Sequence, residues 1–156
     1  MDFTPPLYVG APPGWPSDFG ESALAEDVTL YGMWAPSIDK VSDVSKKFTA
    51  GYSEMYGKVP ATYFAPLSYS AVYIVAEAIE RAGTLEIDAL VKAAKATEYT
   101  SPLGDVITFS PSNVIQNQGI RNQKILQWQN GRQEVLWPFE YSTAKPIYPF
   151  KAWSTR

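Results

Sequence analysis

The spacing of apolar residues predicts helices in the middle of the chain. The first covers 41–55, where apolar residues recur every three or four positions, and Gly57 is a natural helix end. The second runs from about 66 to 82 and ends at Gly83; its apolar residues cover most of its circumference, so we expect it to be largely buried. The apolar positions are Val41, Val44, Phe48, Tyr52 and Met55 in the first helix, and Leu67, Ala71, Val72, Ile74, Val75, Ala78 and Ile79 in the second.

A third helix and several strands complete the pattern. The helix covers about 86–97, with Thr84 as its candidate N-cap. Its inner face is expected to hold Ile87, Leu90, Val91 and Ala94, while 7–9, 28–34 and 106–109 read as strands, 17–25 as a short helix and 138–156 as an extended, proline-containing tail. Strands that alternate with helices favour an α/β architecture.

The dipeptide Asn130-Gly131 predicts a tight β-hairpin. Both central residues of a type I′ turn need positive φ, which Asn and Gly tolerate, and strand-like segments flank the pair on both sides. Such a turn also fixes which residues of the two strands face each other. The expected register pairs Leu126 with Val135 and Ile125 with Leu136.

The composition limits the chemistry available to the protein. The 156 residues carry a net charge of −3 and no basic block, which argues against a nucleic acid as partner. The chain has no cysteine and no histidine, which excludes disulfides, Ser-His-Asp triads and zinc sites built from those residues, and we expect no metal or other cofactor. The longest clean apolar stretch, 71–76, is far shorter than the ~20 residues that span a bilayer, and no signal-peptide core is visible.

An enzyme that works with carboxylates alone stays open as an alternative. Asp39 and Asp43 lie four residues apart, and Glu77 and Glu80 lie three apart, so each pair shares a helix face. General acid–base catalysis needs one carboxyl group of such a pair in a dry pocket, whereas a solvated helix face explains both pairs as surface charge. We therefore expect that the protein is not an enzyme.

Several short motifs occur in a fixed order along most of the chain. They are 48–60 (Phe-Thr-Ala-Gly-Tyr-Ser-Glu-Met-Tyr-Gly-Lys-Val-Pro), 69–83 with its Ala-Ile-Glu-Arg-Ala-Gly end, 102–109 (Pro-Leu-Gly-Asp-Val-Ile-Thr-Phe), 127–138 and 147–153. This order resembles the C-terminal part of an ABC-transporter substrate-binding protein of the branched-chain amino-acid and amide-binding class. The resemblance extends from Leu7 onward, and the order and spacing of the motifs are more specific than any one of them.

The resemblance implies an incomplete type 1 periplasmic-binding-protein fold. We expect an α/β structure with three main helices, a small mixed sheet and a C-terminal β-hairpin. A full member of this family has two lobes joined by a hinge and is over twice as long. By that correspondence residues 1–27 are a remnant of lobe two, 28–34 a hinge-crossing strand and 35–110 a remnant of lobe one. Residues 111–156 then form the return crossing, the hairpin and the extended tail of lobe two.

The resemblance also implies a site between the lobes. Tyr63, Phe64 and Tyr69 match a stretch that lines the side-chain pocket of such proteins, although ordinary packing at the start of a helix explains aromatic residues there equally well. The loop 10–16 matches one that supplies an acidic partner for a ligand ammonium, but here it has no acid. It carries Trp15 instead, a candidate to stack on an apolar or aromatic ligand; the alternative is a wedge that fixes the loop. Because a buried ammonium without a partner is costly, this departure disfavours a simple amino acid.

Two functions therefore remain to be compared. In the first, the chain is a fragment of a solute-binding component that delivers an amino acid, amide or aromatic acid to the membrane subunits of an ABC importer, in the periplasm by family resemblance. In the second, it is a truncated interaction module that self-assembles as a homo-oligomer through exposed apolar surfaces and no longer binds solute.

Overall fold

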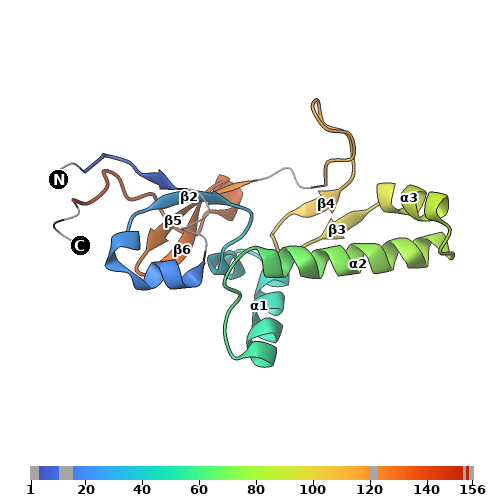
Figure 1. The fold of residues 1–156 in the computed structure, drawn as a ribbon, viewed down its shortest axis with the longest axis horizontal. Helices are drawn as coiled ribbons and strands as arrows, with labels where there is room; N and C mark the ends of the chain where they lie inside the picture. Colours follow the sequence, from blue (N-terminus) through green and yellow to red (C-terminus); the bar gives the residue numbers. More distant parts are fainter. Residues whose placement is uncertain (1–3, 11–15, 120–122, 153, 155–156) are drawn as a thin grey trace.

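Two bodies joined by two crossing strands make up the molecule, as Figure 1 shows for the computed structural model, which describes residues 4–10, 16–119, 123–152 and 154. The first body is built on a mixed four-stranded sheet in the order β1-β2-β5-β6. Strand β1 runs parallel to β2, and the other pairings are antiparallel. The strands are β1 (Val9–Gly10), β2 (Thr29–Gly32), β5 (Lys124–Gln129) and β6 (Arg132–Trp137), with the 3-10 helices η2 (Ser17–Glu21), η3 (Ala23–Ala25) and η5 (Phe139–Tyr141).

The second body holds the three α-helices and a two-stranded antiparallel sheet. Its elements are η4 (Pro36–Lys40), α1 (Asp43–Tyr56), α2 (Phe64–Ala82), α3 (Ile87–Lys95), β3 (Glu98–Thr100) and β4 (Val106–Thr108). The α/β class, the three helices, the small mixed sheet and the C-terminal hairpin expected from the sequence are confirmed. Strand β3 was not expected, because its three residues are too few to show an alternating pattern.

The predicted helix ends are confirmed by backbone geometry. Helix α1 ends at Gly57 (φ 69°) and α2 ends at Gly83 (φ 64°), both in the left-handed region that favours glycine. Helix α1 also has an N-cap, since the Ser42 hydroxyl accepts a hydrogen bond from the Ser45 backbone N–H at 3.3 Å. Thr84 does not cap α3 in this way: its hydroxyl accepts from the N–H of Glu86, which precedes the helix.

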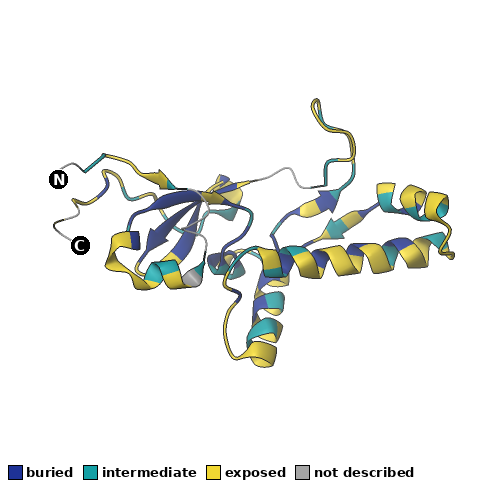
Figure 2. Ribbon diagram, in the orientation of Figure 1, coloured by how far each residue is buried: buried dark blue, intermediate teal, exposed yellow. Residues whose placement is uncertain are grey.

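The expectation that α2 is largely buried is wrong. Its buried residues form one narrow stripe, and Val72 and Val75 on other sides are 68% and 58% exposed. In α1, likewise, Ser45 and Thr49 are buried while Val44 and Met55 of the expected inner face are exposed. Apolar periodicity identified the helices, but the described part of the chain covers only one side of each, as Figure 2 shows. The buried stripe of α2 consists of Pro66, Ser70, Ile74 and Ala78.

The hairpin forms at the predicted turn with a one-residue correction to its register. Asn130 and Gly131 both have positive φ, at 54° and 71°. Leu126 pairs with Val135 as expected, but Ile125 faces Trp137 and not Leu136. An irregularity between Ile125 and Leu126 shifts the register there, and the sequence pattern of alternating residues does not reveal such a bulge.

The two bodies share one hydrophobic cluster. Leu30 of β2, Leu126 of β5 and Val135 of β6 are fully or almost fully buried on one face of the sheet. Trp34, just after β2, extends this cluster toward the second body, and its indole N–H donates a hydrogen bond to the Ser45 hydroxyl of α1 at 2.9 Å. Within the described ranges, each helix is too short or too polar to span a lipid bilayer.

The opposite face of the sheet is covered by the C-terminal tail. The buried Gln127 amide holds the tail at Ile147: its Nε2 donates to the carbonyl oxygen, and its Oε1 accepts from the backbone N–H at 2.8 Å. Gln129 adds a hydrogen bond from its Nε2 to the carbonyl oxygen of Lys145 at 2.8 Å. The part of the tail around 145–147 therefore lies along the sheet as predicted, attached by buried amides and not by ladder pairing, whereas 139–141 form η5 and are not extended.

A buried ion pair fastens the second body to the start of β5. Lys124 is fully buried, and its Nζ lies 2.7 Å from Oδ2 of Asp105, which precedes β4. The same ammonium lies 5.0 Å from the centre of the Tyr141 ring in η5. Burial raises the pKa of Tyr141, and the charge of Asp105 raises it further.

Removing one partner of this pair should destabilise the protein strongly. Lys124→Met leaves the Asp105 carboxylate buried without its cation, and such a loss costs about 3–5 kcal/mol. The double variant Lys124→Met/Asp105→Asn should recover a large part of that loss, because it removes both charges. Urea denaturation measures both effects, with the exposed Lys58→Met as control; equal stability of Lys124→Met and the control would contradict the assignment.

Replacing the Gln127 amide should release the tail. Gln127→Leu keeps much of the side-chain volume but removes both hydrogen bonds to Ile147, each worth about 0.5–1.5 kcal/mol. The amide hydrogen of Ile147 should then exchange with solvent at least about tenfold faster, as measured by NMR, since ~1.4 kcal/mol corresponds to a factor of ten. Gln123→Leu, at an exposed position just before β5, should leave this exchange rate unchanged.

Candidate functional site

The residues singled out from the sequence do not lie together in one pocket. Tyr63 and Phe64 stand at the first turn of α2, close to the crossing strands, whereas Tyr69 lies one and a half turns further along and faces α1. Trp15 lies outside the described residues. The described part of the chain therefore offers two separate places for a ligand, one at the junction of the two bodies and one between α1 and α2.

The junction cluster consists of Tyr31, Tyr63 and Phe64. The rings of Tyr63 and Phe64 are 4.5 Å apart, and the Thr62 hydroxyl fixes the turn before them by accepting the N–H of Phe64. Burial raises the pKa of Tyr63, and the neighbouring phenol of Tyr31 raises it further. Tyr31 and Phe64 are 38% and 55% exposed, so the cluster offers aromatic surface to a ligand.

A separate pocket of about 430 Å³ lies at the hairpin end of the sheet, and residues of both bodies line it. The loop 59–61, which leads into Tyr63, and Pro36 form one side. The hairpin forms the other side of the pocket. It contributes the buried side chain of Trp128 and residues 131–133, at and just after the turn. We call it the junction pocket; it is lined by Pro36, Val59, Pro60, Ala61, Trp128, Gly131, Arg132 and Gln133.

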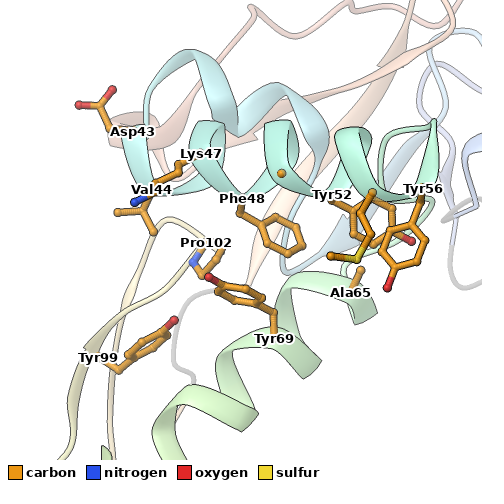
Figure 3. Close-up of a pocket in the computed structure, with 12 residues that line it drawn as sticks. Asp43, Val44, Lys47, Phe48, Tyr52, Tyr56, Ala65, Tyr69, Tyr99 and Pro102 are labelled. Carbon is orange, nitrogen blue, oxygen red and sulfur yellow. The ribbon is translucent and has the colours of Figure 1, made fainter.

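A larger hollow of about 770 Å³ lies between α1 and α2 (Figure 3). At its centre the rings of Phe48 and Tyr69 meet edge to face, with centroids 5.1 Å apart. Figure 3 places Asp43, Val44 and Lys47 toward one end and Tyr52 and Tyr56 toward the other. We call this hollow the α1–α2 groove; it is lined by Asp43, Val44, Lys47, Phe48, Gly51, Tyr52, Met55, Tyr56, Ala65, Tyr69, Tyr99 and Pro102.

Tyrosine contacts extend from the groove along α2. Tyr69 and Tyr73 lie one turn apart with ring centroids 4.7 Å from each other, and the Tyr73 ring stacks on Tyr99 of β3. The hydrogen bond with Tyr73, followed by burial, raises the pKa of Tyr69 to about 12. Tyr69 is therefore uncharged at neutral pH, and the groove is an apolar surface with hydroxyl groups at its margins.

The chemistry of both places suits binding better than catalysis. Aromatic rings bind apolar and aromatic groups, and single polar groups at the edge of such a surface orient a ligand. In the described ranges no group of three or more Asp or Glu residues is placed to hold a metal ion. The sequence did not single out Tyr31 or Trp128 as candidates, because their positions near Tyr63 and near the loop 59–61 depend on contacts between distant parts of the chain.

The comparison with protein families identifies this fold. The family model described as "Periplasmic binding protein" matches residues 2–133 of the chain. No curated protein sequence matches the chain.

Solved structures with the same fold come from several solute-binding proteins. A leucine-binding protein from Thermotoga maritima is 23% identical, with a TM-score of 0.65, and the match covers 82% of this chain and 35% of that one. A solute-binding protein from R. palustris in complex with benzoate is 15% identical, with a TM-score of 0.62 and coverage of 84% and 34%. A fatty acid ABC transporter substrate-binding protein from Thermomonospora curvata is 17% identical, with a TM-score of 0.60 and coverage of 93% and 40%.

The chain thus spans between a third and two fifths of the length of these structures. At such low identity these matches establish only that the fold is shared. The family model, which matches most of the chain, establishes that the chain belongs to the same family. The chain belongs to the periplasmic binding protein family, and its structure is a part of the type 1 fold of the ABC-transporter substrate-binding proteins.

Proposed function

We propose that the chain serves in solute binding for an ABC importer and holds a small organic solute where its two bodies meet. The observations that support this proposal are that residues of both bodies line the junction pocket, and that the junction cluster brings Tyr31 of β2 near Tyr63 before α2. A solute bound there contacts both bodies at once. Its binding energy can therefore favour one relative orientation of the bodies over another.

This proposal assigns parts of the chain to the lobes of a two-lobed receptor. Residues 1–27 and 111–156 belong to lobe two, 35–110 to lobe one, and 28–34 to the hinge between them. The partition is supported by the sheet order, because β1, β2, β5 and β6 form one sheet and the helices with β3 and β4 lie beyond it. The partners are then the membrane subunits of an importer, and the location is the periplasm.

The solute we propose is a small acid with an apolar or aromatic side chain. The junction cluster supplies aromatic surface, and among the described residues no carboxylate lines the junction pocket to pair with a ligand ammonium. Structures of this fold include one with benzoate, one with leucine and one of a fatty acid transporter protein, so the fold accommodates such acids. Tyr63 and Phe64 are proposed to contact the apolar part, with Trp15 from the loop after β1; Tyr69 is proposed as a more distant contact.

Titration calorimetry with benzoate, L-leucine and octanoate tests the proposal directly. At least one of these acids should bind saturably and raise the melting temperature, because a ligand that binds only the folded state stabilises it by about 2.7 kcal/mol at 100 times its Kd. Phe64→Ala should weaken that binding about 10- to 100-fold, since burying a Phe side chain is worth about 1.5–3 kcal/mol.

The control for this experiment is Phe139→Ala. Phe139 is 81% exposed on η5 and lines neither the junction pocket nor the α1–α2 groove, so its removal should leave the affinity unchanged. Equal loss of affinity in both variants would argue against the junction cluster as the site. Absence of binding heat and of any thermal shift with all three acids would argue against this choice of solute.

A further inference from the structure

The junction pocket carries its charge on a single residue among the described residues that line it. That residue is Arg132, the first residue of β6. The other side chains of the lining are apolar or aromatic, apart from the amide of Gln133. Sites for small molecules typically combine an apolar wall with a few polar groups that fix the orientation of the ligand. The junction pocket has this composition, and the sign of its charge favours an anion.

The β5–β6 hairpin holds the backbone of Arg132 in place. The turn is formed by Asn130 and Gly131, both with positive φ. Immediately after the turn, Arg132 pairs with Gln129 of β5. The carboxylate of Glu26 fixes the turn further, because its Oε1 accepts a hydrogen bond from the backbone N–H of Asn130 at 2.9 Å. The side chain of Arg132 remains exposed, so it can meet a ligand.

The carboxylate that follows Arg132 on the same strand is already neutralised. Glu134 lies two residues further along β6, and residues at this spacing point to the same face of a sheet. The ammonium of Lys40 lies 2.8 and 2.9 Å from the two oxygens of Glu134, and the Thr143 hydroxyl donates to one of them. Arg132 itself forms no ion pair with another described residue. Its guanidinium therefore keeps its donors for a ligand.

A guanidinium is suited to a carboxylate in particular. Its planar fork presents parallel N–H donors that match the two oxygens of a carboxylate, whereas a Lys ammonium acts as a point charge. The wall opposite the hairpin consists of Pro36 and the loop 59–61, which belong to the second body. The pocket volume of about 430 Å³ lies within the range of about 300–1,000 Å³ that is typical of small-molecule sites. The apolar part of an acid held at Arg132 can therefore reach the second body.

We propose that Arg132 binds the carboxylate of a small acid in the junction pocket, while the apolar part of that acid lies against Pro36 and the loop 59–61. This inference rests on the proposed function, and it names the residue that selects an acid over its uncharged analogue. The charge of Arg132 contributes nothing to an analogue in which a neutral amide replaces the carboxylate.

Calorimetry with the full chain tests this role on a matched pair of probes. The acid is benzoate, L-leucine or octanoate, whichever binds most tightly, and its partner is the corresponding primary amide. Arg132→Gln should weaken binding of the acid about tenfold, the lower end of the range for hydrogen bonds to charged groups, because the side chain is exposed. Binding of the amide should change less than about twofold. Arg132→Lys should bind the acid with intermediate affinity, because it keeps the charge and loses the fork.

The control is Lys92→Gln, which makes the same change in net charge. Lys92 is exposed on α3 and lies outside the lining of the junction pocket, so both affinities should remain those of the unaltered chain. Circular dichroism checks that each variant keeps its secondary structure.

The contrary results separate this inference from the function on which it rests. If Arg132→Gln binds the acid as tightly as the unaltered chain, the role of Arg132 is overturned and solute binding stands. Equal loss for the acid and the amide also overturns it, since Arg132 would then shape the pocket without binding the carboxylate. An equal loss in Lys92→Gln assigns the effect to overall charge and overturns it as well. If the unaltered chain binds none of the three acids, the proposed solute and the role of Arg132 fall together.

Discussion

The antiparallel pairing of β2 with β5 is the contact on which the rest of the structure depends. These strands are the only described backbone ladder that runs between the N-terminal and C-terminal parts of the chain, and Leu30 pairs with Leu126 at its buried centre. Strand β1 adds to one side of this pair and β6 to the other. Because β2 leads directly into η4 and α1 of the second body, this pairing also fixes where the helices begin. The Trp34–Ser45 hydrogen bond attaches that body just after β2, and the Lys124–Asp105 ion pair attaches it at the start of β5.

The same arrangement separates two kinds of apolar surface. Where the two bodies meet, Tyr31 of β2 lies near Tyr63 of the loop before α2, and a separate small pocket is lined by residues of both bodies. Between α1 and α2 the aromatic surface lines a larger hollow of about 770 Å³. The solute proposed above suits the first, because residues of both bodies line the junction pocket.

The sequence predicted where the helices and the hairpin lie better than it predicted which of their residues are buried. Periodicity located all three helices, glycines located their ends, and Asn130-Gly131 located the hairpin, because each of these signals is local. Prediction from the sequence failed where the burial of a residue depends on contacts with residues far away in the sequence. Val72 and Val75 look like core residues but are exposed, since no described element covers that side of α2. Ser45 and Gln127 look like surface residues but are buried, because Trp34 and the tail supply their hydrogen-bond partners. Tyr63 and Phe64 became candidates through family motifs, whereas Tyr31 became a candidate only through its position near Tyr63.

Hydrogen exchange measured residue by residue across the whole chain tests the account most directly, because protection reports the free energy needed to open each hydrogen bond. If the crossing ladder holds the molecule together, the amide hydrogens shared between β2 and β5, near Leu30 and Leu126, exchange most slowly and only on global unfolding. The helices of the second body, with one covered side each, should open earlier. Rapid exchange in β2 and β5 while α1 and α2 remain protected would contradict the account, since the two bodies would then be stable without the pairing that is held to join them.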